Sequence, residues 1–169
     1  MLRLIITLCL GCCAMALWAV EDPPALIDTD GLREVTAAAL QHREHHLIDV
    51  ASFVEKAAAS GTVILDTRSA AAYARKHIAG AINLPFSDFT AAKLAALIPD
   101  PDTEILIYCN NNILGSPPAF ESKAMPLALN LPTYINLFGY GYRNVWELDR
   151  AIRLDDERIR FAGSDFDQK

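Results

Sequence analysis

One cysteine stands where a buried strand is expected to end. Cys109 follows the expected strand Glu104–Tyr108, which is apolar after Glu104. An uncharged segment comes next, made of Asn110, Asn111, Asn112, Ile113, Leu114, Gly115 and Ser116. A cysteine reacts as its thiolate, and backbone N–H groups or a helix N-terminus facing the sulfur lower its pKa. We therefore take Cys109 as the candidate catalytic residue and this segment as the candidate binding loop.

The residues after the loop predict the start of a helix. Pro117 suits a first helical turn and Ser116 suits its N-cap. We expect a helix from Pro117 to about Leu129 and another over Pro132–Tyr140. Between a strand end and a helix N-terminus, backbone N–H groups can converge on an anion such as a thiolate or persulfide. The three asparagines either donate hydrogen bonds into this pocket or adopt left-handed backbone conformations, which asparagine tolerates.

The amino-terminal stretch predicts export. Arg3 precedes an apolar run from Leu4 to Trp18, and the acidic, proline-containing segment Glu21–Pro24 follows. The run has about 15 residues, whereas a membrane span needs roughly 20. It therefore favours a secretory signal over residues 1–19, and a periplasmic or secreted protein without a membrane span after processing. The alternative is an uncleaved N-terminal anchor.

Removal of this leader would leave one thiol. The sequence has four cysteines, and Cys9, Cys12 and Cys13 lie in the leader, so that Cys109 remains. Lipid attachment through Cys12 or Cys13 is a minority alternative, because the residues before them match a lipoprotein signal poorly. In an oxidising compartment an unpaired thiol is either reactive or a buried small hydrophobe.

Composition favours a globular domain and argues against several classes of function. The 169 residues are 52% hydrophobic and 21% charged, with a formal net charge of -6. Nucleic-acid binding requires a basic surface, and no basic run is longer than Arg75-Lys76. His42, His45 and His46 lack a nearby cysteine or paired carboxylates, so we expect a solvated helix end there, with no metal and no cofactor.

Short strands alternate with helices along most of the chain. We expect strands at 46–49, 62–66, 81–84, 104–108 and 144–148, and further helices at 29–43, 50–60, 70–76, 90–98 and 149–159. This alternation predicts a three-layer α/β domain, with a mostly parallel five-stranded sheet and helices on both faces. We place a linker and N-terminal helix at 20–46, the domain at 47–155, and a helix end with a frayed tail at 156–169. Ligands bind beyond the carboxyl ends of such strands, where Cys109 stands.

Several segments together resemble rhodanese domains. Leu65–Arg68, Tyr73 and His77–Pro85 match the family signature of Asp-x-Arg, an aromatic residue and His-Ile-x-Gly-Ala-x-Asn. Ile105–Cys109 is similar to the active-site strand, and Gly141–Leu148 to the closing Gly-Phe-x-Asn-Val-x-x-Leu segment. The resemblance implies a rhodanese-like fold and sulfur transfer. A low-pKa Cys109 thiolate would take sulfane sulfur as a persulfide and pass it to a small or protein thiol.

The loop departs from the family pattern. Its relatives commonly carry Arg-Ser at the fifth and sixth positions after the cysteine, where this chain has Leu114 and Gly115. Ser116 stands one position later, so the loop is one residue longer than usual. In this length it resembles the loop of rhodanese-fold phosphatases. Those enzymes carry an arginine at the sixth position after the cysteine, where this chain has Gly115. Neutral donors hold an anion less well than a guanidinium, so thiosulfate and phosphoryl substrates are disfavoured. A catalytically inactive binding or redox-responsive module is the alternative function.

Asp66 and Arg68 end the strand expected beside that of Cys109. Arg68 is our candidate for the positive charge that the loop lacks, and Asp66 would lie beside it in the binding site. The alternative is a structural ion pair between the two. We expect His77 to fix the turn before Gly80 rather than to act as a base.

Overall fold

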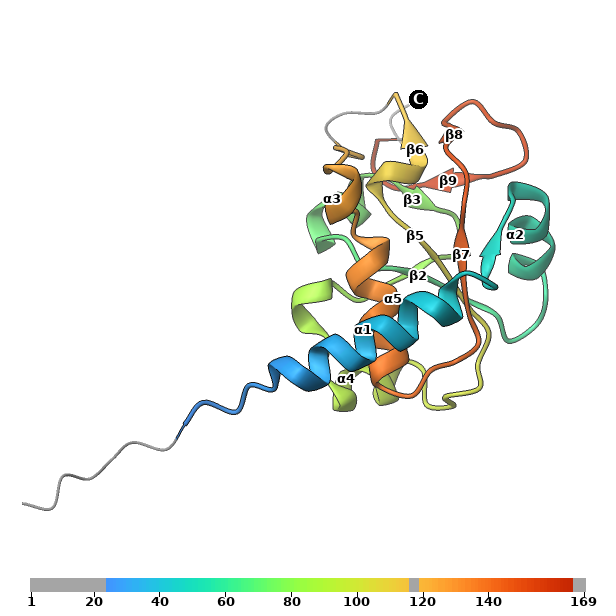
Figure 1. Cartoon of the computed structure of the whole chain (residues 1–169). Coiled ribbons are helices and arrows are strands. Elements are labelled where there is room, and N and C mark those ends of the chain that lie inside the picture. Colours follow the sequence, from blue (N-terminus) through green and yellow to red (C-terminus); the bar gives the residue numbers. More distant parts are fainter. Residues whose placement is uncertain (1–23, 116–118, 166–169) are drawn as a thin grey trace, which may run out of the picture.

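A parallel sheet forms the centre of the fold (Figure 1). The computed structural model describes residues 24–115 and 119–165. The sheet has the strand order β1-β7-β5-β2-β4, and every neighbouring pair runs parallel. Its strands are β1 (Leu47–Ile48), β2 (Val63–Asp66), β4 (Ile82–Asn83), β5 (Ile105–Tyr108) and β7 (Val145–Leu148). The expected five-stranded parallel sheet is confirmed.

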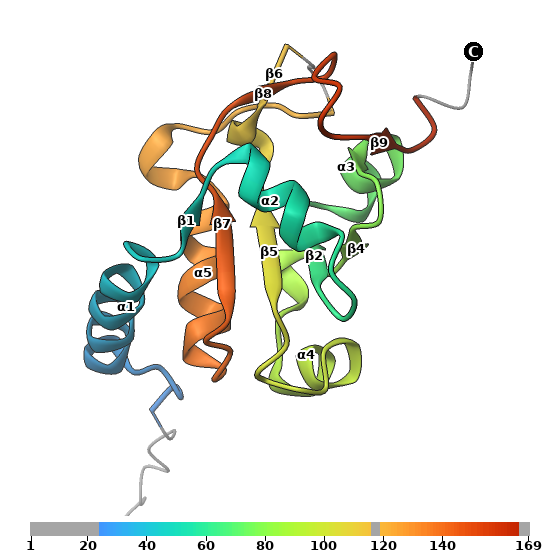
Figure 2. The same ribbon diagram turned by 90° about the vertical axis from the view of Figure 1, so that its right-hand side faces the viewer.

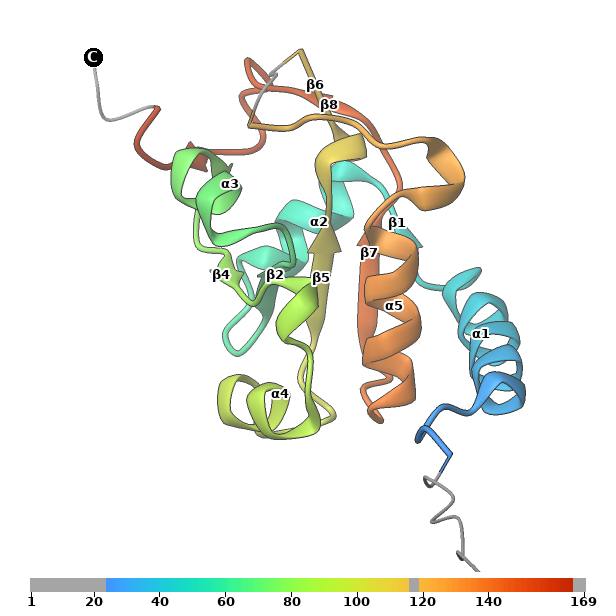
Figure 3. The same cartoon turned by 90° about the vertical axis from the view of Figure 1, so that its left-hand side faces the viewer.

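Helices cover both faces of this sheet (Figures 2 and 3). One face packs against α2 (Val50–Ala57), and the other against α4 (Ala91–Leu97) and α5 (Asn130–Gly139). Along β5, Leu106 and Tyr108 join the core on the α2 side, whereas Ile105 and Ile107 join the core on the α4 and α5 side. All four are buried, which explains why β5 is a continuous apolar run rather than an alternating one.

Helix α1 (Thr29–Arg43) lies beside α5, outside the layer that α4 and α5 form. The helix predicted at this position is confirmed. Its N-cap is Asp28, whose Oδ1 accepts a hydrogen bond of 2.8 Å from the backbone N–H of Gly31. Thr29 and Asp30 can accept such a bond as well, so the sequence alone leaves the choice of cap open among these three neighbouring residues.

The helix expected over residues 117–129 is wrong in its described part. Residues 119–129 contain only a short 3-10 turn, η3 (Met125–Leu127), and α5 begins directly afterwards. Pro126 lies inside this stretch. Proline lacks an N–H group and its ring clashes with the preceding turn, so a helix through position 126 is strongly disfavoured.

The helix expected over residues 149–159 is also wrong. The chain there forms turns and β8 (Ile152–Arg153), followed by β9 (Phe161–Ala162). Strand β8 pairs with β6 (Ile113–Leu114), and β9 pairs with β3 (His77–Ile78). These partners lie far away in the sequence, so local helical spacing does not reveal them.

The carboxyl-terminal tail, which was expected to fray, is bonded to α3 (Ala70–Arg75) as far as the described residues extend. Ser164 and Asp165 donate backbone hydrogen bonds to the carbonyl oxygens of Ala74 and Arg75, at 3.0 and 3.1 Å. Gly163 has a φ of +118°, and a Cβ at this position would lie 2.4 Å from Arg75 O. Glycine therefore permits this close approach.

The predicted leader lies outside the described residues, as do its cleavage sites, Cys12 and Cys13. Ser116 and Pro117, the expected helix start, lie outside them as well. Among the helices of residues 24–115 and 119–165, none combines the length and apolarity needed to cross a membrane.

Candidate functional site

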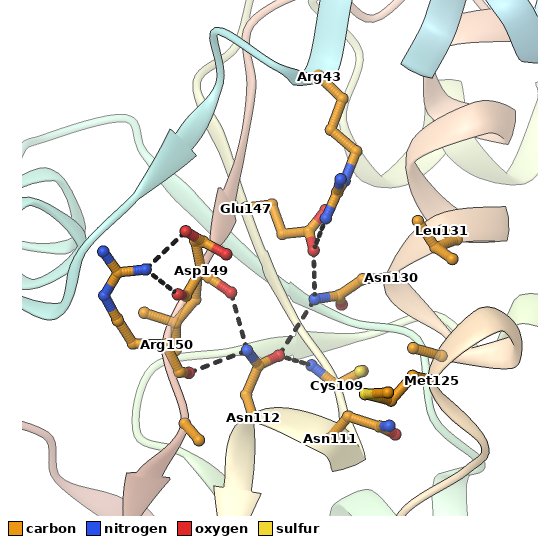
Figure 4. A pocket seen from close by; sticks show the side chains of 13 residues that line it. Arg43, Cys109, Asn111, Asn112, Met125, Asn130, Leu131, Glu147, Asp149 and Arg150 are labelled. Atoms are coloured by element: carbon orange, nitrogen blue, oxygen red, sulfur yellow. Dashed lines mark hydrogen bonds and ion pairs between the residues drawn. The ribbon is translucent and has the colours of Figure 1, made fainter. Parts of the chain in front are cut away.

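Cys109 lies at the carboxyl end of β5, the middle strand of the sheet (Figure 4). It is only 1% exposed, and it lines an open pocket of about 270 Å³. Several elements contribute to the pocket wall, including α1 with Arg43, the start of α5 with Asn130 and β7 with Glu147. The cysteine therefore lies at the base of a pocket beyond the strand end, where parallel sheets commonly bind ligands.

Opposing influences act on the Cys109 thiol. Burial raises its pKa above the ordinary value, and the nearby Glu147 carboxylate raises it further. The backbone N–H groups of Asn111, Asn130 and Leu129 oppose this rise, because they stabilise the thiolate. The net direction is upward, so the resting thiol is protonated near neutral pH. This differs from the expected low-pKa thiolate, because the sequence predicts N–H groups near the sulfur but does not indicate how deeply the thiol is buried.

The helix N-terminus at the sulfur is that of α5. Leu129 is the N-cap of this helix and Asn130 its first residue. The sequence had suggested a helix start at Pro117 for this role. Backbone donors and a helix dipole thus face Cys109 as expected, but a segment 20 positions downstream in the chain supplies them.

The Asn112 side chain connects the Cys109 turn to the end of β7 by hydrogen bonds. Asn112 closes the 3-10 turn η2 (Asn110–Asn112), and its Oδ1 accepts a hydrogen bond of 2.9 Å from the Cys109 backbone N–H. Its Nδ2 donates to the carbonyl oxygens of Leu148 and Arg150, at 2.8 and 3.1 Å. The side chain is thereby committed to the backbone. Within the described chain only glycines have a positive φ, so the left-handed alternative for the asparagines is wrong.

Asn110 and Asn111 hold the segment that replaces the expected helix. Asn110 Nδ2 donates to Glu121 O at 2.7 Å. Asn111 exchanges two hydrogen bonds with the Lys123 backbone, at 2.7 and 3.0 Å. Asn111 also lines the Cys109 pocket, whereas Asn110 lines a different one. These amides bind neighbouring backbone rather than standing free as donors to a ligand.

The remaining loop residues lead away from the pocket. Ile113 is buried in the core on the α2 side, and Leu114 is exposed beside it in β6. Gly115 has a φ of +75°. None of these three described residues lines the Cys109 pocket. The expected cradle of backbone N–H groups therefore does not extend over residues 113–115.

Asp66 and Arg68 form a buried ion pair, with 2.5 Å between Arg68 Nη2 and Asp66 Oδ2. The guanidinium also donates to Ala119 O at 2.9 Å and to Lys76 O at 2.6 Å. The Tyr108 hydroxyl donates to Asp66 Oδ2 at 2.5 Å. Neither charged residue lines the Cys109 pocket. The structural alternative describes them, and Arg68 does not bring its charge to the thiol.

The other residues of the His-Ile-x-Gly-Ala-x-Asn segment also make structural contacts. His77 stacks on Tyr73, with 3.9 Å between ring centroids, and its Nδ1 hydrogen-bonds Tyr73 O at 2.8 Å. Asn83 Nδ2 donates to Asp66 O and Arg68 O, at 2.8 and 3.0 Å. The segment therefore holds β4 against the end of β2.

The histidines at the end of α1 contact aromatic rings. His42 stacks on His46 with 3.9 Å between ring centroids, and His42 Nδ1 lies 2.8 Å from the Tyr134 hydroxyl. Burial lowers the pKa of His42. In residues 24–115 and 119–165 no group of three or more histidine, cysteine, aspartate or glutamate side chains is arranged to hold a metal ion.

The pocket residues that sequence reasoning missed include Arg43, Asn130 and Glu147, whose polar side chains form one network beside Cys109. Glu147 could have been suspected, because it interrupts the apolar strand Val145–Leu148 and a buried carboxylate needs a cationic partner. The sequence contains no comparable indication for Arg43 or Asn130.

Comparison with known proteins identifies the family of this fold. A family model described as the rhodanese-like domain matches residues 49–153. The chain belongs to the rhodanese-like domain family. The expected family and fold are thereby confirmed.

Several solved structures are similar to this chain at low sequence identity. The rhodanese-like domain of an Anabaena protein is 18% identical with a TM-score of 0.51, and the match covers 73% of this chain and 83% of that one. A rhodanese from E. coli, solved with anions, is 21% identical with a TM-score of 0.41, covering 61% and 99%. A thiosulfate sulfurtransferase from Pseudomonas aeruginosa is 22% identical with a TM-score of 0.43, covering 71% and 20%. No curated protein matches the chain.

Proposed function

We propose that this rhodanese-like domain is a sulfurtransferase or persulfide carrier that acts through Cys109. One observation carries the proposal: the Cys109 sulfur lies at the base of an open pocket with the N–H groups of Asn111, Leu129 and Asn130 facing it. Such donors favour a negative sulfur, and both the thiolate and the persulfide are anions. The predicted leader would place this reaction in the periplasm or outside the cell.

The reaction needs no oxidant or cofactor. Cys109 loses its proton, and its thiolate attacks the sulfane sulfur of a donor R–S–S⁻. The S–S bond of the donor breaks, R–S⁻ leaves with the electron pair, and Cys109 holds a persulfide. An acceptor thiolate then attacks the outer sulfur, takes it and releases the Cys109 thiolate.

The charge of the pocket favours a small persulfide donor over the thiosulfate dianion. The two arginines of the described wall, Arg43 and Arg150, are paired with Glu147 and Asp149, at 2.5 and 2.6 Å. Residues 109–115 contain no charged side chain. A dianion would therefore meet little uncompensated positive charge, whereas a thiol persulfide carries less charge to be neutralised.

Replacement of Cys109 by serine should abolish sulfur uptake. The full chain is incubated with thiosulfate and, separately, with a small alkyl persulfide whose only charge is on its outer sulfur. Peptide mass spectrometry then reads Cys109 apart from Cys9, Cys12 and Cys13. We expect one added sulfur atom on the Cys109 peptide, more from the persulfide than from thiosulfate, and none at this position in Cys109→Ser. Absence of added sulfur on Cys109 with both donors would contradict the proposal.

Sulfur uptake should accelerate with pH beyond the range of an ordinary thiol. Burial raises the pKa of Cys109 above the usual thiol value of about 8.5. Below that raised pKa the thiolate fraction increases about tenfold per pH unit. The folded chain also keeps this proton longer than the unfolded chain. The resulting stability is complete below about pH 8.5 and is lost as pH rises through the folded pKa. The measurement is the initial uptake rate against pH; a plateau at or below pH 7 would contradict the prediction.

A second candidate function is a non-catalytic binding or redox-responsive module. The 1% exposure of Cys109 and its raised pKa favour it. It predicts no sulfur on Cys109 at any pH at which the fold persists, and partner binding unchanged in Cys109→Ser. The uptake experiment above separates the two candidates.

A further inference from the structure

Helix α1 reaches the Cys109 pocket from outside the segment that the family model matches. Arg43, its last residue, donates two hydrogen bonds to the Glu147 carboxylate: Nε donates to Oε2 at 2.5 Å and Nη2 to Oε1 at 2.7 Å (Figure 4). The Glu147 side chain is 7% exposed. A bidentate contact with a buried carboxylate fixes both partners in position and orientation.

The contacts continue from this ion pair to the cysteine. Asn130 Nδ2 donates to Glu147 Oε1 at 3.2 Å and to Asn112 Oδ1 at 3.1 Å. Asn112 Oδ1 also accepts from the Cys109 N–H at 2.9 Å. Both protons of the Asn130 amide are used. A flip of this amide would place its oxygen against a carboxylate, so the orientation is fixed.

Asn130 joins the two ends of this network. Its side chain is held by Glu147, while its backbone N–H faces the Cys109 sulfur. A shift of Glu147 would thus move a group that stabilises the thiolate. The carboxylate also disfavours the thiolate by its charge, and the Arg43 guanidinium balances that charge. Asp149 and Arg150, the other charged residues of the described wall, pair with each other.

We propose that Arg43 is a positioning residue of the Cys109 site, which fixes Glu147 and Asn130 beside the sulfur and balances the buried carboxylate. Helix α1 then contributes a residue to the Cys109 site in addition to packing against α5. The inference rests on the proposed function for the reaction that the thiol performs. Its test does not, because the ionisation of Cys109 is measurable without any sulfur donor.

The test is the rate at which iodoacetamide alkylates Cys109 across pH in the full chain. The Cys109 peptide is followed by mass spectrometry, separately from Cys9, Cys12 and Cys13. In Arg43→Met the carboxylate acts unopposed, so the profile should move to higher pH and the rate at pH 7 should fall about three- to tenfold. Arg43→Lys keeps the charge without the two-pronged contact and should recover part of the loss.

Two further variants make the test specific. Glu147→Gln keeps an oxygen for the Asn130 amide but removes the charge, so the profile should move to lower pH. Lys56→Met is the matched control, because it breaks the Lys56–Glu104 pair, which is also 2.5 Å long and partly buried but does not line the Cys109 pocket. This control should leave the profile unchanged.

A wild-type profile in folded Arg43→Met, or an equal shift in Lys56→Met, would overturn the inference. If Arg43→Met does not fold, Glu147→Gln decides, and an unmoved profile in that variant refutes the role. The proposed function is tested separately. If the variants shift the alkylation profile as expected but Cys109 takes up no sulfur, only the proposed reaction is contradicted. If Cys109 takes up sulfur but the variants leave the alkylation profile unchanged, only the role of Arg43 is contradicted.

Discussion

Replacing Arg68 with methionine should lower the free energy of unfolding by about 3–5 kcal/mol, the usual cost of breaking a buried ion pair. Asp66 is 0% exposed and Arg68 is 3% exposed, so water cannot take over the role of the lost guanidinium. Methionine fills similar space but donates nothing to Asp66, to Ala119 O or to Lys76 O. The Asp66 carboxylate would keep the Tyr108 hydroxyl but lose its charged partner.

Urea unfolding followed by circular dichroism measures this loss. A natural domain has only about 5–15 kcal/mol of stability, so much of the Arg68→Met protein should be unfolded at temperatures the wild type tolerates. Arg158→Met is the control, because Arg158 pairs at 2.6 Å with Asp156 from an exposed position. Solvent screens that pair, and its loss should change little. Equal midpoints for the two variants would refute the importance of the buried pair.

Replacing Asn112 with alanine should lower the free energy of unfolding by about 2–4 kcal/mol and abolish sulfur uptake by Cys109. Four hydrogen bonds disappear, to the Cys109 N–H, the Asn130 amide, Leu148 O and Arg150 O. Each buried group left without a partner costs about 1–3 kcal/mol, and local relaxation recovers part of the sum. The turn that holds Cys109 at the base of its pocket would lose its main attachment to β7.

Asn111→Ala is the control for this prediction. Asn111 is the preceding residue, but its side chain hydrogen-bonds only the Lys123 backbone, at an exposed position. Water can replace them, so we expect a loss of about 1 kcal/mol or less and sulfur uptake that persists. Urea unfolding and peptide mass spectrometry of both variants give the comparison. Similar losses in the two variants would show that Asn112 has no special role.

The central sheet was predictable because the evidence for it is local. The runs that form β2 and β5 are continuous and, apart from Asp66 at the end of β2, apolar, as is typical of strands buried on both faces. Two predicted helices are wrong, one because a proline within it was not taken into account and the other because its strand partner is distant in the sequence. Pro126 argued against the helix over residues 117–129, and the pairing of β8 with β6 replaced the expected terminal helix.

The place of Cys109 follows from the order of residues alone. A cysteine directly after a buried parallel strand must emerge at the carboxyl edge of the sheet, because strand direction and strand end are both encoded locally. The uncharged character of its loop is equally a property of the residue order.

The ionisation of that thiol was decided only by the tertiary structure. Burial under α5, the N–H groups of Leu129 and Asn130, and the Glu147 carboxylate all act on it, and each comes from a distant part of the chain. Arg43 and Glu147 are 104 positions apart. Electrostatic and desolvation effects depend on distance in space, which the spacing of residues in the sequence does not specify.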